Sequence, residues 1–118
     1  MTKNESPLQI SETVREGVCV ISIDGRLDAQ TTEGAQSIFS EAAKTHPRIL
    51  LDCANTTFLS SSGLRAIVMT HRAAGDSGGR IAVYVPRPEI LATIHISGIQ
   101  KMIAIHPKIE DAIAALKA

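Results

Sequence analysis

The sequence predicts a single α/β domain whose mixed, mainly parallel β-sheet starts with a hairpin and carries about four helices. Three observations predict this class. Two β-like runs near the N-terminus are joined by a short segment that contains glycine. After them, short apolar runs alternate with segments of helical periodicity, as in the βα units of a parallel sheet. The chain has 118 residues, the size of one ordinary domain.

The predicted hairpin comes first. Residues 8–14 alternate between apolar and polar side chains, and residues 18–25 form a second run of the same kind. The three residues Arg-Glu-Gly between the two runs are expected to form the turn. Residues 1–7 are expected to be a flexible tail, so the predicted domain covers residues 8–118.

The periodicity becomes helical in residues 30–45. Thr31 or Thr32 is expected to cap this helix, because a hydroxyl can accept a hydrogen bond from a free N–H group of the first turn. His46 and Pro47 are expected to end it, since a proline disfavours helical geometry in the residue before it. The face expected to point inward holds Ala35, Ile38, Phe39, Ala42 and Ala43.

The rest of the chain continues the alternation of strand and helix. Residues 48–54 are nearly all apolar, which is typical of a buried parallel strand. The loop NTTFL (residues 55–59) is expected to follow and to lead into a helix that begins at three serines. The remaining predicted elements are a turn at GDSGG (75–79), a strand at 81–85, a short helix at 88–98 that ends at Gly98, a strand at 102–106 and a terminal helix at 107–118.

The composition limits the classes of partner. Hydrophobic residues make up 44% of the chain and charged residues 20%, which is typical of a globular protein. Twelve basic and twelve acidic residues cancel, and aromatic residues are only 3%, so nucleic acid is not an expected partner. The apolar runs are too short to cross a membrane and no signal peptide is evident, so we expect no membrane partner and a cytoplasmic location.

The cysteines and histidines give no sign of a metal site or a disulfide. Cys19 and Cys53 each lie inside an apolar run, as buried reduced thiols do. The histidines are dispersed, and none forms a helical pair with a carboxylate in a ligand pattern. The phosphate-loop pattern is missing as well, so we expect neither a metal nor a cofactor.

Three consecutive serines, Ser60, Ser61 and Ser62, stand where the second helix is expected to begin. The first turn of a helix has unpaired N–H groups and a partial positive charge. A serine hydroxyl can cap these groups, and a phosphate can bind them. By themselves the residues favour a cap at Ser60 or Ser61 and leave a functional role open.

The residues around the serines resemble the signature of the STAS family of anti-sigma factor antagonists. In that signature a strand ends in aspartate, and an aromatic, an aliphatic, Asp-Ser-Ser-Gly and an aliphatic residue follow. A second stretch, GRLDAQTT (residues 25–32), is similar to the family's Gly-x-Leu-Asp before the first helix, and the resemblance covers about residues 8–117. The matching residues of the signature are Asp52, Phe58, Leu59, Ser60, Ser61, Ser62, Gly63 and Leu64.

The resemblance implies a regulated binding surface. The family's phosphorylated residue is the first serine after the aspartate, which corresponds to Ser61. The family aspartate is replaced by Ser60 in this chain, so Ser60 and Ser62 remain rival acceptors. Asp28 is expected beside the serines, where it would help to define the docking surface or orient a hydroxyl, or would only cap the helix at residues 30–45. Partner contacts are expected at Asp28, the three serines and Gly63.

The implied partner is an anti-sigma factor that is a serine/threonine kinase with a histidine-kinase-like ATPase fold. The resemblance implies that this partner is bound while Ser61 is bare, that phosphorylation releases it, and that a phosphatase resets the cycle. The ATP would belong to the partner, so this chain would need no cofactor. The alternative is a STAS-type scaffold or transport-complex subunit that binds constitutively.

The other serine motif does not predict an enzyme. GDSGG is similar to the surroundings of the catalytic serine in chymotrypsin-like proteases, but that chemistry needs a histidine base and an orienting acid. Its place between a helix and a strand indicates a turn instead. The serine run also fails to match the Gly-x-Ser-x-Gly elbow of hydrolases, since Leu59 and Ser60 precede Ser61. We therefore expect no catalytic residue.

Overall fold

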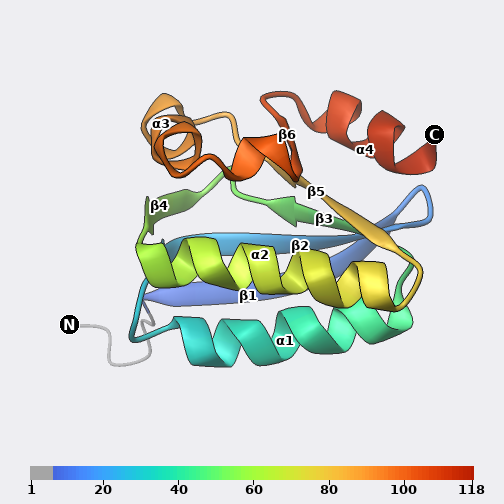
Figure 1. Ribbon diagram of the computed structural model, residues 1–118, viewed down its shortest axis with the longest axis horizontal. Helices are drawn as coiled ribbons and strands as arrows, with labels where there is room; N and C mark the ends of the chain where they lie inside the picture. The colour runs from blue at the N-terminus through green and yellow to red at the C-terminus, as the bar shows by residue number, and fades with distance from the viewer. Residues whose placement is uncertain (1–6) are drawn as a thin grey trace.

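The computed structural model describes residues 7–118, in which βα units follow an N-terminal hairpin (Figure 1). The strands are β1 (Leu8–Arg15), β2 (Val18–Leu27), β3 (Arg48–Asp52), β4 (Thr56–Leu59), β5 (Arg80–Tyr84) and β6 (Ala104–His106). The helices are α1 (Thr32–Thr45), α2 (Ser61–Asp76), α3 (Pro88–Ser97) and α4 (Ile109–Lys117), with the short 3₁₀ helix η1 (Ile99–Lys101) after α3.

The six strands form one mixed sheet, in which five follow the order β1-β2-β3-β5-β6 and β4 pairs with β2 outside this order. β1 pairs antiparallel with β2, and the other pairs are parallel. β3 pairs with residues 19–22 of β2, and β4 continues alongside β2 at residues 25–27. The predicted α/β class, the hairpin and the mainly parallel sheet are therefore confirmed.

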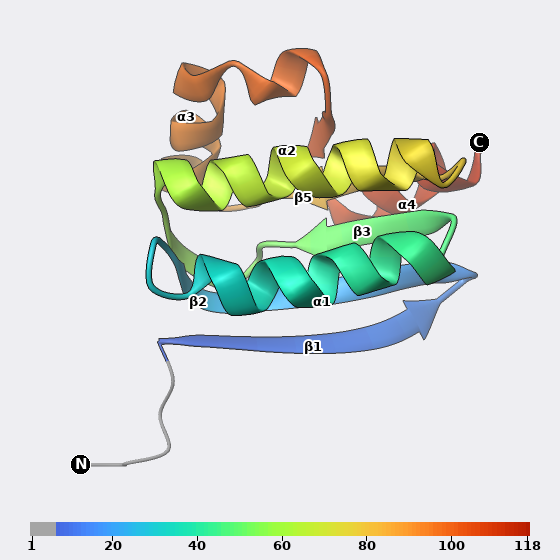
Figure 2. The same cartoon turned by 60° about the horizontal axis from the view of Figure 1, so that its bottom comes forward.

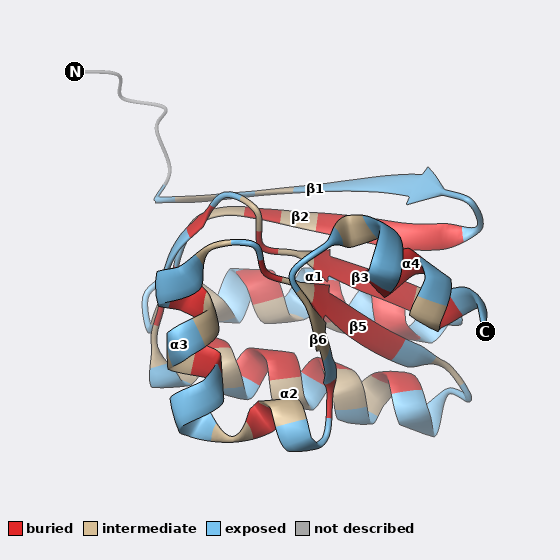
Figure 3. Ribbon diagram, turned by 90° about the horizontal axis from the view of Figure 1, so that it is seen from above, coloured by how far each residue is buried: buried red, intermediate tan, exposed pale blue. Residues whose placement is uncertain are grey.

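Helices cover both faces of the sheet. α1 and α2 lie on one face, and α4 lies on the other (Figures 1 and 2). β2 alternates between the two sides: Cys19, Ile21 and Ile23 join the core with α1 and α2, whereas Val18 and Val20 join the core with α4. The central strands are mostly buried, while β1 at the edge is mostly exposed (Figure 3).

The expected loop over residues 55–59 is wrong, because Thr56–Leu59 forms β4. The sequence does not predict this strand, because it is only four residues long, begins with two threonines and pairs with β2, which lies far away along the chain. The buried Thr56 hydroxyl donates a hydrogen bond of 2.6 Å to the carbonyl of Ile23, which satisfies the polar side chain inside the core.

Smaller differences concern the edges of elements. Ile38, expected on the inner face of α1, is 36% exposed at the margin of that face. β6 begins only at Ala104, because η1 follows the end of α3 at Gly98, whose φ of +85° suits glycine. The turn predicted at residues 75–79 begins only at Ser77, because Gly75 and Asp76 belong to the last turn of α2, and it contains Gly78 with a φ of +81°. The predicted tail lies outside the described residues except for Pro7, whose carbonyl accepts a hydrogen bond of 2.7 Å from the Arg26 amide.

Candidate functional site

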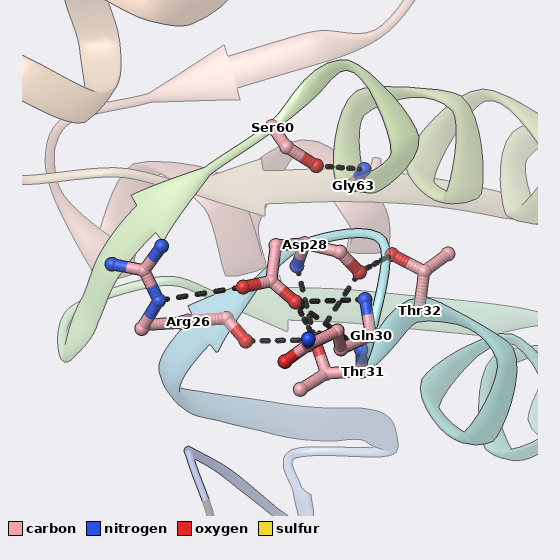
Figure 4. A network of polar contacts seen from close by, with 7 residues as sticks. All are labelled: Arg26, Asp28, Gln30, Thr31, Thr32, Ser60 and Gly63. Carbon is pink, nitrogen blue, oxygen red and sulfur yellow. Dashed lines mark hydrogen bonds and ion pairs between the residues drawn. The ribbon is translucent and has the colours of Figure 1, made fainter.

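Two loops meet at the end of the molecule where α1 and α2 begin. β2 and β4 run parallel and place Leu27 opposite Leu59, so the residues that follow them emerge at the same edge. The Ser60 amide donates a hydrogen bond of 3.0 Å to the carbonyl of Leu27. The Asp28 loop (residues 28–31) and the serine turn (residues 60–62) are therefore neighbours (Figure 4).

Ser60 caps α2. Its backbone is extended, and its Oγ accepts a hydrogen bond of 3.2 Å from the Gly63 amide (Figure 4). Its carbonyl also accepts the Leu64 amide at 2.9 Å. Of the two serines that the sequence suggested as the cap, the structure selects Ser60, whose hydroxyl is already engaged.

Ser61 is the first residue of α2 and is exposed. Within residues 7–118, neither its hydroxyl nor its amide has a hydrogen-bond partner, and the Ser62 amide also has none. The first N–H groups of a helix have no partner within the helix. Ser60 accepts the Gly63 and Leu64 amides, so the amides of Ser61 and Ser62 are the two that remain unpaired in the described chain. The first turn thus presents a free hydroxyl next to two free donors, in the positive end of a helix dipole.

Gly63 holds α2 close to the end of β2. A Cβ atom at this position would lie 2.6 Å from the carbonyl oxygen of Leu27 and 2.9 Å from a methyl carbon of Leu59. Both contacts are shorter than van der Waals packing allows, so only glycine lets the helix approach this strand. Gly63 therefore sets how closely the start of α2 packs on the end of β2.

Asp28 organises the loop in front of α1. Its Oδ1 accepts hydrogen bonds from the amides of Gln30 at 3.0 Å and Thr31 at 3.2 Å. Its Oδ2 accepts a hydrogen bond of 3.3 Å from Nε of Arg26, which also forms an ion pair (Figure 4). The carboxylate is therefore held by three donors and is only 18% exposed.

These donors also change the acidity of Asp28. Burial of the carboxyl opposes ionisation, but the backbone N–H groups of Gln30 and Thr31 and the Arg26 guanidinium favour it more strongly. The pKa of Asp28 therefore lies below its ordinary value. Asp28 is therefore ionised at neutral pH next to the serine turn, where it is paired with Arg26.

Thr31 and Thr32 tie the loop and do not cap α1 with their side chains. Thr31 occupies the N-cap position but makes no side-chain hydrogen bond to the helix. Its hydroxyl donates to the carbonyl of Arg26 at 2.8 Å and accepts the Asp28 amide at 3.0 Å. The Thr32 hydroxyl donates to the carbonyl of Asp28 at 2.5 Å. The expected side-chain cap of α1 by Thr31 or Thr32 is wrong, because both hydroxyls form hydrogen bonds with residues that precede the helix.

No hydrogen bond joins Asp28 to any of the three serines among the residues that the structure describes. The structure brings the loops together but gives Asp28 no direct hold on a serine hydroxyl. Of the roles expected for Asp28, the one that its contacts resemble is the cap, because its carboxylate holds the Gln30 and Thr31 amides in the turn that leads into α1.

A cation–π pair that the sequence did not predict lies beside the serine turn. The guanidinium carbon of Arg26 lies 4.3 Å from the centre of the Phe58 ring, and 40% of Phe58 is exposed. The two residues are directly opposite in the pairing of β2 with β4. Because β4 was expected to be a loop, no signal in the sequence placed these side chains together.

A groove of about 580 Å³ runs between α1 and α2 from the serine turn. Ser62 and Arg65 from α2 line it opposite Thr32 and Gln36 from α1, and Met69 lies further along. Ser62 is half-buried in this wall, whereas Ser61 is exposed.

None of the helices in residues 7–118 has the length and apolar character needed to cross a membrane.

Known proteins resemble this chain over most of its length. Residues 9–112 match the STAS domain family. The "Anti-sigma F factor antagonist" of Paenibacillus polymyxa is 28% identical over 93% of this chain and 96% of that protein. The structure of an anti-sigma factor antagonist from Mycobacterium paratuberculosis has a TM-score of 0.85 and 25% identity, covering 94% of this chain and 95% of the other. The phosphorylated form of the Bacillus cell fate determinant SpoIIAA, at 23% identity, shares the fold with a TM-score of 0.66, covering 92% and 97% of the two chains.

Proposed function

The chain belongs to the STAS domain family, and from this premise we propose that it is an anti-sigma factor antagonist controlled by phosphorylation of Ser61. The observation that carries the proposal is the free, exposed Ser61 hydroxyl at the start of α2, beside a charged and aromatic surface. The name of the Paenibacillus relative supports the general role. The phosphorylated form recorded for SpoIIAA shows that this fold can carry such a group.

The contacts favour Ser61 over its two rivals. Ser60 uses its oxygen to cap Gly63, so modification there would remove the cap of α2. Ser62 is half-buried in the wall of the α1–α2 groove, where a kinase would have less access. Ser61 is exposed and its hydroxyl is free of other bonds in the described chain, so phosphate can be added without loss of an existing contact.

The proposed docking surface combines the serine turn, the Asp28 loop and the Arg26–Phe58 pair. Gly63, also expected to contact the partner, is buried and positions the start of α2 beneath this surface. Arginine and aromatic residues are enriched at protein interfaces, because they provide large contact area together with a polar group. The partner we propose is an anti-sigma factor that is also a serine/threonine kinase with a histidine-kinase-like ATPase fold. In this scheme the chain is a binder and a substrate without catalytic activity, and a phosphatase removes the phosphate.

The same phosphate has opposite effects on the chain and on the complex. It adds a charge of about −1.5 to −2 at neutral pH. Within the chain, the free N–H groups of Ser61 and Ser62 and the dipole of α2 favour an anion. Arg65, four residues after Ser61, lies on the same side of the helix and adds positive charge. In the complex, the phosphate must be desolvated near the negative Asp28, and a loss of about 1.4 kcal/mol already weakens binding tenfold.

Peptide mapping tests the phosphorylation site. The full chain is incubated with its cognate anti-sigma kinase and ATP, and the phosphorylated residue is located by mass spectrometry. We expect phosphate on Ser61, none in Ser61→Ala, and normal labelling in the matched variant Ser62→Ala. Phosphate on Ser60 or Ser62 alone would show that the assignment of the acceptor is wrong.

A binding measurement tests the switch. Ser61→Asp adds a charge at the helix start, and Ser61→Asn adds nearly the same volume without charge. We expect both variants to keep the native circular dichroism spectrum, and Ser61→Asp to bind the kinase at least about tenfold more weakly than Ser61→Asn does. If both variants fold and bind equally, charge at this position does not control docking, and the constitutive scaffold becomes the better description.

A further inference from the structure

Three side chains that can ligate a metal meet at the end of the molecule opposite the serine turn. They are Glu12 of β1, Cys19 of β2 and His46, which follows α1. One ligand atom from each residue, namely a carboxylate oxygen, the thiol sulfur and an imidazole nitrogen, lies within 4.8 Å of the other two. We refer to these three residues as the Glu12–Cys19–His46 cluster.

The hairpin and α1 explain why these residues converge. Cys19 is opposite Val14 in the antiparallel pair, so Glu12 is its diagonal neighbour on the same face of the sheet. That face packs against α1, because Leu8 and Ile10 of β1 and Cys19 of β2 contact the core on this side. α1 runs along it and ends over the hairpin (Figure 2), where His46 caps the helix.

The surroundings of Cys19 differ from those of a thiol held only by apolar contacts. The Cys19 side chain is within hydrogen-bond reach of a Glu12 carboxylate oxygen, with 3.6 Å between sulfur and oxygen. The carbonyl groups at the end of α1 also favour a cation, since they carry the negative end of the helix dipole. Cys19 is buried, whereas Glu12 is exposed and His46 half-buried, so the cluster lies at the margin of the core.

We propose that the Glu12–Cys19–His46 cluster binds a zinc ion. One thiolate, one imidazole and one carboxylate form a ligand set that suits Zn²⁺, and three protein ligands leave the fourth tetrahedral position for water. Zinc bonds of about 2.0 to 2.3 Å place neighbouring ligand atoms roughly 3.5 Å apart. The three ligand atoms now lie within 4.8 Å of one another, so side-chain movements of about 1 Å would bring them to that geometry.

Metal binding at this cluster exchanges a proton for the ion. The S–H bond of Cys19 breaks, its proton passes to the solvent, and a sulfur–zinc bond forms without any change of oxidation state. The two anionic ligands, Cys19 and Glu12, then balance the charge of the ion. The ion would link the edge strand β1, its neighbour β2 and the end of α1, so it would stabilise the folded chain over the unfolded one.

Cobalt provides a spectroscopic test, because Co²⁺ bound by a thiolate shows a charge-transfer band that Co²⁺ in water lacks. The two cysteines allow a matched comparison. Cys53→Ser leaves Cys19 as the sole thiol, and we expect it to keep the band at one equivalent of Co²⁺ and to lose it when Zn²⁺ is added. Cys19→Ser leaves only Cys53, and we expect no band. A wild-type chain without the band, or a band that remains in Cys19→Ser, would overturn the proposal.

Thermal unfolding supplies a second readout that does not need a thiol spectrum. We expect Zn²⁺ to raise the unfolding midpoint of the wild type and of His95→Gln, an exposed histidine in α3. The same addition should raise the midpoint little or not at all in His46→Gln and Glu12→Gln. Equal shifts in all four proteins would overturn the proposal, since the ion would then act elsewhere. Neither experiment depends on Ser61 or on a kinase.

Discussion

Ser60, Ser61 and Ser62 have the same side chain, but their positions at the start of α2 separate their roles. The Ser60 oxygen binds the Gly63 amide, the Ser62 side chain lines a groove, and the Ser61 hydroxyl is free and exposed. A difference of one residue therefore decides between a structural cap and a proposed phosphate acceptor. The physical cause is the helix, whose geometry directs successive side chains about 100° apart.

Gly63 is a residue at which one added methyl group should disturb the site. In Gly63→Ala the new Cβ would meet the Leu27 carbonyl oxygen at 2.6 Å, so α2 must shift. We expect a loss of about 1–3 kcal/mol in the free energy of unfolding. Gly75→Ala in the same helix has no atom within 4 Å of the new Cβ, and it should keep that free energy or raise it by up to about 1 kcal/mol. Urea titration of the two variants measures the contrast, and equal stabilities would contradict the close-packing role.

Asp28 should make the stability of the chain depend on pH. Its pKa is lower in the folded chain than its ordinary value, because the favourable donors outweigh the effect of burial. Its contribution is therefore fully present above the ordinary carboxyl pKa of about 4, and it is lost as the pH falls through the lowered folded value. We expect Asp28→Asn to be less stable than the wild type at neutral pH, with the difference shrinking in acid. Urea unfolding at several pH values measures this, and Asp76→Asn, at an exposed carboxylate, serves as control.

At the scale of elements, the start of α2 depends on a cap that differs from the family pattern. Ser60 stands where the family has aspartate, yet its oxygen still accepts the Gly63 amide. We expect Ser60→Ala to lower the free energy of unfolding by about 1 kcal/mol, because the Gly63 amide would lose its partner. Ser60→Asp keeps an acceptor and adds charge at the positive end of α2, so it should match or exceed the wild type, by about 0.3–1 kcal/mol. If Ser60→Ala unfolds at the same urea concentration as the wild type, the cap contributes no stability.

β4 shows how one short element creates a surface. By pairing with β2 beyond the end of β3, it places Phe58 opposite Arg26 and brings Ser60 to the carbonyl of Leu27. The docking surface that we propose is thus held by main-chain pairing on one side and by a helix start on the other. Rigid elements of this kind present side chains more accurately than a free loop does.

At the scale of the whole molecule, the proposed phosphate site and the proposed zinc site lie at opposite ends of one core. The serine turn is at the C-terminal ends of the parallel strands, and the Glu12–Cys19–His46 cluster is at the hairpin and the end of α1 (Figure 2). The buried apolar residues of β2, β3 and β5 separate the two ends. A charge added at one end therefore need not disturb the contacts at the other.

The closed core also predicts how Cys53 reacts. This side chain is 1% exposed, and burial raises its pKa to about 12. At neutral pH the thiol should stay protonated and shielded, so alkylation of Cys53 should proceed only when the chain unfolds. Mass spectrometry after treatment with an alkylating reagent, with and without denaturant, measures this. Labelling of the native chain as fast as that of the denatured chain would contradict a closed core around Cys53.

Much of the fold could be predicted from the sequence, because its signals are local. Alternating residues gave the hairpin, the helical spacing from Ala35 to Ala43 gave α1, and the serines placed the start of α2 and its cap. β4 escaped prediction because it has only four residues, two of them threonines, and depends on a partner strand that is distant along the chain. Ser61 and Asp28 were found through the family resemblance, whereas Arg26 and Phe58 required the register between two strands.

The sequence alone determined the order of the elements apart from β4 and η1, the family, and the place where α2 begins, since each depends on residues that are neighbours along the chain. Only the tertiary structure decided which serine caps α2 and which is exposed, how Asp28 is held, and that Glu12, Cys19 and His46 converge. These arrangements require β1, β2, β4 and the two long helices to be packed at fixed distances. Such distances follow from strand pairing and burial across the whole sheet, and no short stretch of sequence contains them.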